Sequence, residues 1–214
     1  MHEARARETS KSHIESLSDM IFGLALSIGA LILIGNAPRN FYGLINSILS
    51  FAFSFLILIT VWYSYTRTME HVHIGTRQGI DLNIFLLFLV SIEPFLFNEL
   101  FSTSLPTQYV SILYGLDLGG LFAVQAVFAN SVLIDKNRPK EVIRYYTILR
   151  NAEMVGAIVF FVSLLPIFWT LATTVDQTRI PLRYLIWVAP PFIRFIRRVG
   201  KRRQANLSLG PFYD

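Results

Sequence analysis

The sequence predicts an all-α integral membrane protein with six transmembrane helices in a single domain over residues 1–214. Three observations predict this fold class. Hydrophobic residues make up 53% of the 214-residue chain and charged residues only 15%, whereas a soluble domain carries about a quarter charged residues. The apolar residues fall in long runs, and a helix needs roughly 20 mostly apolar residues to cross a membrane. Runs such as LNIFLLFLVSI do not alternate apolar with polar residues, as the strands of a membrane barrel do.

Six segments meet the length requirement, and polar breaks that we expect to be loops separate them. The predicted spans are Leu17–Gly35, Phe41–Tyr63, Ile80–Phe101, Tyr109–Ile134, Ala152–Thr173 and Leu182–Val199. The first helix is predicted to begin at Ser12, because Ser12 and Glu15 have the S-x-x-E spacing of a capping box. The start of the chain is polar and is not predicted to be a cleavable signal peptide.

The distribution of lysine and arginine predicts the orientation. Of the 19 basic residues, 16 lie in the N-terminal tail, the second and fourth loops and the C-terminal end, and 3 lie in the other loops. Because positive residues concentrate on the cytoplasmic side, both termini are predicted to be cytoplasmic. The basic C-terminal end fits the phosphate headgroups of the adjacent membrane, so no nucleic-acid partner is predicted.

Four acidic residues inside the predicted spans are candidate functional residues, because an ionisable side chain in lipid is costly. Asp19 lies near the cytoplasmic end of the first span, and the sequence leaves open whether it anchors the helix or takes part in ion passage. Glu93 precedes Pro94, where a kink beside a paired glutamate is favoured over an ion-coupling carboxylate. Asp117 and Glu153, which lies at the start of the fifth predicted span, are similar cases, and a position at the membrane interface is the alternative for Glu153.

The motifs of enzymes and of ordinary potassium channels are missing from the sequence. The chain has no cysteine, no H-E-x-x-H, no G-x-S-x-G and no P-loop. We therefore predict no enzyme, no catalytic residue, no metal site and no cofactor. The T-V-G-Y-G filter and an arginine-rich voltage-sensing helix are missing too.

Pairs of small residues four apart occur in two spans. They are Ala25 with Gly29 in the first and Gly115 with Gly119 in the fourth. Small residues let helices approach closely. The spacing does not decide between packing around an oligomer axis and packing within one bundle.

The first half of the chain resembles the transmembrane protein 175 family of potassium channels, which occurs in endolysosomes and in prokaryotes. The segment HIESLSD from His13 to Asp19 is similar to the R-x-x-x-F-S-D signature of that family. Two further patterns match its second and third helices: Ser54-Phe55 with Trp62, and Asn83 with Pro94. The sequence departs from the family pattern at His13, Leu17, Ser27 and Tyr65.

The resemblance implies a homotetrameric cation channel, selective for potassium, whose first helices line a central pore. Bulky apolar residues would form the constriction at Leu24, Ile28 and Leu31, with the selectivity hydroxyl at Ser27. A polar cluster would hold the pore helix at its cytoplasmic end; its members would be His13, Ser18, Asp19, Trp62, Tyr65 and Asn83. The implied partners are other copies of the chain, membrane lipids and monovalent cations such as permeating K⁺, in a prokaryotic plasma membrane.

The residues alone are compatible with an apolar stripe that lines a pore, but they do not identify the helix face that forms it. Leu24, Ile28 and Leu31 have i, i+4, i+7 spacing and share one helix face. The helix is apolar on every side, however, so such a stripe fits any face. Two other functions therefore stay open: a small secondary transporter that uses Glu93 or Asp117 as a proton-coupling carboxylate, and a membrane scaffold without transport.

Overall fold

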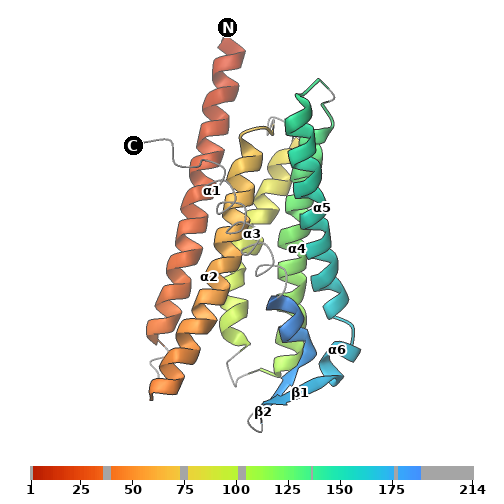
Figure 1. Cartoon of the computed structure of the whole chain (residues 1–214). Helices are drawn as coiled ribbons and strands as arrows, with labels where there is room; N and C mark the ends of the chain where they lie inside the picture. The colour runs from red at the N-terminus through yellow and green to blue at the C-terminus, as the bar shows by residue number, and fades with distance from the viewer. Residues whose placement is uncertain are drawn as a thin grey trace, which may run out of the picture.

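The computed structural model describes residues 2–35, 40–72, 77–100, 105–135, 137–175 and 178–188. Five long helices stand side by side and alternate in direction along the chain (Figure 1). They are α1 (His2–Gly35), α2 (Phe41–Met69), α3 (Arg77–Glu99), α4 (Thr107–Leu133) and α5 (Lys140–Ser163). Each of the five contains a stretch long and apolar enough to cross a membrane.

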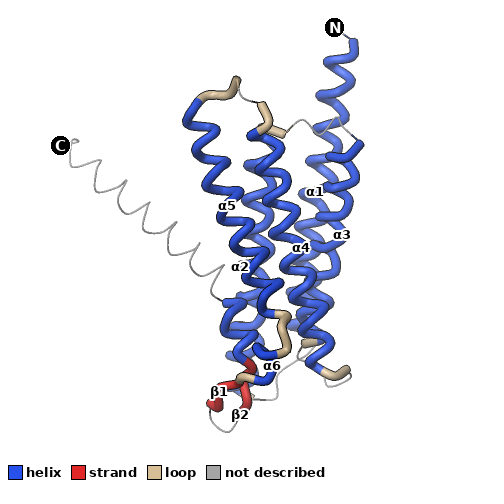
Figure 2. Tube along the Cα trace, turned by 90° about the vertical axis from the view of Figure 1, so that its right-hand side faces the viewer, coloured by secondary structure: helices blue, strands red, loops and turns tan. Residues whose placement is uncertain are grey.

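Short elements follow α5 at one end of the bundle (Figure 2). They are α6 (Ile167–Thr170), β1 (Ala172–Val175) and β2 (Thr178–Pro181). The two strands pair antiparallel, with Ala172 opposite Pro181 and Val175 opposite Thr178. Residues 182–188 then form the beginning of a further helix.

Capping and proline residues determine several helix ends. The side chain of Asn40 accepts a hydrogen bond of 2.7 Å from the backbone N–H of Gly43, which satisfies one of the unpaired donors at the start of α2. Pro106 and Pro139 immediately precede α4 and α5. At the other end of α5, Pro166 lacks the N–H that a continuing helix needs, and the helix ends at Ser163.

Helix α4 is the most buried of the five spans and α1 the least. Within the described residues, α4 packs against α5, α3 and α2, whereas the main contacts of α1 are with α2 and α3. Figure 1 shows α1 at the edge of the molecule. The N-terminal end of α1 lies at the same end of the bundle as the α2–α3 and α4–α5 connections. Among the residues that the structure describes, no helix covers the other long face of α1.

The paired small residues of α1 and α4 pack against other helices of the same bundle. A side chain at Gly119 would come within 2.6 Å of the Phe161 ring, and one at Gly115 within 2.5 Å of Leu164. Both glycines thus let α4 and α5 pack in close contact. A side chain at Gly29 would lie 3.4 Å from the Phe51 ring of α2, an ordinary contact distance, and Ala25 is buried.

The sequence-based boundaries were wrong at three places. The first helix begins at His2 and runs through Ser12, so the S-x-x-E pair is not a cap. The fifth helix runs from Lys140 to Ser163 and not from Ala152 to Thr173, because residues 140–151, which we expected to lie in a loop, form its amphipathic first half. The TVDQTRIP break forms most of the β-hairpin. Most of the predicted sixth span, from residue 189 on, lies outside the described residues.

Candidate functional site

The exposed face of α1 carries a regular stripe of side chains. Its members recur at intervals of three and four residues: Leu17, Met20, Leu24, Ser27 and Leu31. The exposed fractions of the four apolar side chains are 54% for Leu17, 69% for Met20, 61% for Leu24 and 64% for Leu31. Ile28, the third residue expected at the constriction, is only partly exposed. The opposite face packs into the bundle through Ser18, Phe22 and Ala25.

Ser27 presents its oxygen lone pairs on this stripe. Its hydroxyl donates a hydrogen bond of 2.8 Å to the backbone carbonyl of Gly23, four residues earlier. Since a serine hydroxyl carries one hydrogen and two lone pairs, the hydrogen is engaged with the helix. The side chain therefore faces outward as an acceptor.

On the buried side of α1, Ser18 joins three helices. Its hydroxyl donates to the carbonyl of Ile14 at 2.8 Å and accepts from the Tyr65 hydroxyl of α2 at 2.7 Å. The Asn83 side-chain amide of α3 donates to the same oxygen at 3.4 Å. One donated and two accepted bonds use the whole capacity of a hydroxyl. The Phe22 and Tyr65 rings pack beside it with centroids 5.7 Å apart.

Asp19 makes a second link between α1 and α2. The indole Nε1 of Trp62 donates to Oδ1 of Asp19 at 2.9 Å, and Asp19 is exposed in the protomer. The structure thus brings together five of the six residues expected in the polar cluster. His13 is exposed and lies on α1 five residues before Ser18. Among the described residues no hydrogen bond joins it to the other five.

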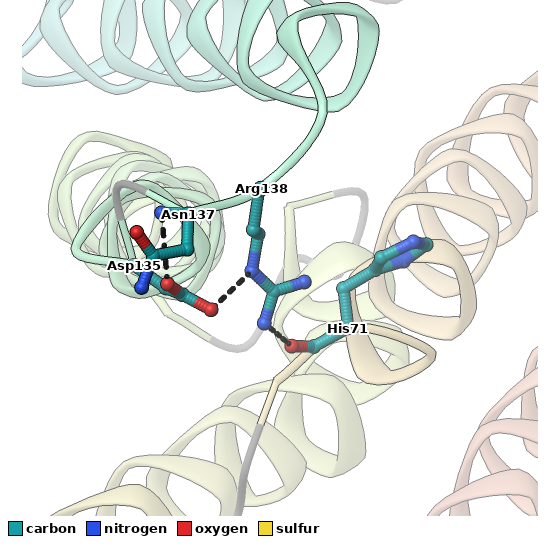
Figure 3. A network of polar contacts seen from close by, with 4 residues as sticks. All are labelled: His71, Asp135, Asn137 and Arg138. Carbon is teal, nitrogen blue, oxygen red and sulfur yellow. Dashed lines mark hydrogen bonds and ion pairs between the residues drawn. The ribbon is translucent and has the colours of Figure 1, made fainter.

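A second polar network ties the end of α2 to the α4–α5 connection. Figure 3 shows Arg138, whose Nη2 donates to the His71 carbonyl at 2.7 Å and whose Nε lies 3.5 Å from Oδ2 of Asp135. The Tyr146 hydroxyl, from α5, donates to the carbonyl of Arg67 at 2.6 Å and lies 3.0 Å from Nδ1 of His71. Because that hydroxyl has only one hydrogen, Nδ1 of His71 is the donor in their contact.

Buried polar groups also lie inside the bundle, behind α1. Glu93 of α3 is fully buried and accepts hydrogen bonds from Ser54 and Tyr114. Glu153 accepts a hydrogen bond of 3.1 Å from Ser64 of α2 and is 2% exposed. The expectation that Glu153 lies at the start of the fifth helix was wrong, because thirteen residues of α5 precede it. At a rise of 1.5 Å per residue they place it about 20 Å along the helix.

The sequence did not indicate the role of Arg183. This buried side chain binds the end of α5 through hydrogen bonds to the carbonyls of Ser163 and Leu164, at 2.8 and 3.0 Å. Its Nη1 also contacts the Ser111 hydroxyl of α4 at 2.6 Å. Arginine near a helix C-terminus satisfies carbonyls that lack an intrahelical partner. The count of basic residues had included Arg183 only among the three in the loops that are expected to face away from the cytoplasm.

The polar cluster and the exposed stripe lie in one segment of the chain, formed by α1 to α3. Residues 13–94 match the family of the endosomal/lysosomal potassium channel TMEM175. The resemblance that the sequence indicated is confirmed over these residues. No match was found among curated proteins or among solved structures.

The TMEM175 match and the five apolar helices indicate the class of protein. The apolar helices are those of an integral, multi-pass membrane protein, and the family that residues 13–94 match is one of potassium channels. The match ends at Pro94, so α4, α5 and the hairpin lie outside it.

Proposed function

We propose that the chain forms a homotetrameric, potassium-selective channel in a prokaryotic plasma membrane, with α1 lining a central pore. The exposed stripe on α1 is the observation that carries this proposal. It lies on the least buried span and within the segment that matches the TMEM175 family.

The spacing of the stripe suits contact between copies of α1. Leu17, Leu24 and Leu31 recur every seven residues, with Met20 and Ser27 between them. A repeat of three and four residues keeps one face of a helix directed at a shared axis. The partly exposed Ile28 lies at the margin of the stripe and would contact a neighbouring α1 as well as the pore.

The chemistry of the stripe suits a cation pore without a backbone filter. Rings of leucine narrow a pore and oppose its wetting, which makes a barrier to ions. A ring of Ser27 oxygens, whose hydrogens are bonded to the helix, replaces some of the water around a passing cation. Leu24 would form the tightest ring, with Leu31 beyond it toward the outside.

The polar cluster would hold this helix in place. Ser18 is bonded to α2 and α3, and Asp19 to α2, in the part of α1 that the proposed orientation makes cytoplasmic. Because these contacts lie on and beside the buried face, they fix the rotation of α1 and so the direction of the stripe.

The experiment is single-channel recording of the purified protein in bilayers under potassium and sodium gradients. Leu24→Ala is expected to raise the conductance and weaken ion discrimination, since it widens the constriction. Ile158→Ala is the matched control, because Ile158 is 54% exposed on α5, whose main contacts are with α4. Unchanged conductance and selectivity in Leu24→Ala would contradict the pore assignment. Flux that requires a proton gradient would favour a transporter that couples through Glu93 or Asp117.

A further inference from the structure

Two buried carboxyl groups belong to the packed helices α3 and α4 inside each protomer, in the half of the bundle near the β-hairpin. Glu93 of α3 is 0% exposed and Asp117 of α4 is 4% exposed. Tyr114 of α4 donates a hydrogen bond of 3.0 Å to Glu93, and Asp117 follows Tyr114 by three residues, so it lies on the same face of α4. The pair lies behind α1 and does not belong to the exposed stripe.

The hydrogen bonds around Glu93 are few and come from hydroxyls alone. Ser54 of α2 lies 3.1 and 3.0 Å from its two carboxylate oxygens, and Tyr114 lies 3.0 Å from one of them. Each hydroxyl has one hydrogen to donate. Glu93 thus receives two hydrogens.

Asp117 receives none. Neither of its carboxylate oxygens has a hydrogen-bond partner among the residues that the structure describes. Pro94 adds a further acceptor nearby, because a proline inside α3 leaves the Val90 carbonyl without its helical N–H. The carboxylate oxygens and the Val90 carbonyl therefore outnumber the hydrogens that the neighbouring hydroxyls can donate to them.

No cation within the described part of the chain compensates the two carboxyls. Arg183 is the basic residue near this end of α4, where it contacts Ser111, one turn from Tyr114. Its other guanidinium nitrogens are bonded to the carbonyls that end α5. Two uncompensated charges in a buried apolar site would cost many kcal/mol, and such groups neutralise instead.

We propose that Glu93 and Asp117 form a proton-binding site inside each protomer, in which each carboxyl holds a proton at neutral pH. The protons supply the hydrogens that the site lacks and remove the repulsion between α3 and α4. A metal ion fits less well, because the hydroxyls of Ser54 and Tyr114 lie directly on Glu93 at hydrogen-bond distance. The site is separate from the proposed pore and does not depend on ion conduction.

Infrared spectroscopy of the purified protein in detergent tests this inference, because a protonated carboxyl has its own C=O stretching band. The band is expected at neutral pH in the unaltered protein. Asp117→Asn and Glu93→Gln, which resemble the neutral acids in shape, should each remove a separate component of it. Asp81→Asn is the control, since Asp81 is exposed on the same helix α3 and should leave the band unchanged. Glu153 is also buried, and Glu153→Gln assigns any component of the band that comes from it.

The inference is overturned if Asp117→Asn leaves the C=O band of the protonated carboxyls unchanged. If Glu93→Gln does not fold, the spectrum of Asp117→Asn alone tests the inference. It is also overturned if the carboxylate bands shift when potassium is replaced by sodium, because a bound metal ion would then supply the positive charge. Neither measurement needs a current, so failure here is distinguishable from failure of the proposed channel.

Discussion

Trp62 and Asp19, 43 positions apart in the sequence, are joined by a hydrogen bond of 2.9 Å from the indole Nε1 to Oδ1. One turn of helix further along α2, Tyr65 donates to Ser18, the neighbour of Asp19. Two consecutive residues of α1 are therefore bonded to one face of α2. Their burial differs, since Ser18 is buried and Asp19 is exposed, and the two bonds should contribute differently to stability.

Tyr65→Phe is expected to destabilise the protein more than Trp62→Phe. The first change removes a buried donor to Ser18, at a cost of about 1–3 kcal/mol. The second removes a bond to an exposed carboxylate that water can solvate, at a cost of about 1 kcal/mol or less. Thermal unfolding in detergent measures both. A larger loss for Trp62→Phe would show that Asp19 is shielded from water in the assembled protein.

The orientation can be tested by single cysteines, because the natural chain has none. Asn40→Cys, Leu105→Cys and Thr173→Cys place thiols at exposed positions at one end of the bundle. If both termini are cytoplasmic, an impermeant reagent labels all three from outside intact cells. Asp135→Cys, at the other end, should react only after the cells are opened. The reverse pattern would overturn the predicted topology.

The sequence predicted the first four spans because they are continuous apolar runs. α5 was misplaced because its first half is amphipathic. Lys140 and Arg144 are exposed there while Tyr146 is buried, and a run with this composition resembles a loop. The hairpin was missed because its strands have four residues each. The threonine, valine and isoleucine around the break were the available signal.

The candidate site could be predicted only in part from the residues. The i, i+4, i+7 pattern fits any face of an apolar helix, so the resemblance, not the periodicity, indicated Leu24 and Leu31. Contacts such as Asn83 with Ser18 join residues 65 positions apart, which no local pattern reveals. Tyr146 and Arg183 were missed for the same reason, since each binds carbonyls of a distant helix end.

Gly119→Ala tests the close contact between α4 and α5. The added methyl group would lie 2.6 Å from a carbon of the Phe161 ring, so the ring or the helix must move. Overpacking of this kind costs about 1–3 kcal/mol, and the unfolding temperature should fall. Gly23→Ala is the control, because nothing lies within 4 Å of a methyl group there. Equal effects of the two changes would contradict the packing argument.

Arg183→Lys is expected to destabilise the end of α5 although it keeps the charge. The guanidinium binds Ser163, Leu164 and Ser111 through three nitrogens, and a single ammonium group cannot reproduce this fork. Each buried carbonyl left without a donor costs about 1–3 kcal/mol. Hydrogen exchange should increase in the last turn of α5 and in residues 182–188. If exchange is unchanged there, Arg183 does not fix this part of the chain.

Ser27→Ala tests whether the hydroxyl on the α1 stripe contacts the permeating ion. The change removes an oxygen from the pore surface but barely alters its width, so the preference for potassium over sodium should fall while the conductance changes little. Ser91→Ala is a close control, since Ser91 is exposed on α3 and its hydroxyl also donates to the carbonyl four residues earlier, at 2.7 Å. Both changes remove the same helix hydrogen bond, and only Ser27 lies on the stripe. The potassium and sodium permeability ratio, taken from reversal potentials in asymmetric solutions, separates the two outcomes. Equal ratios in both variants and the unaltered protein would show that Ser27 faces lipid or another helix, whereas a lower ratio in Ser27→Ala alone requires its oxygen to lie in the ion path.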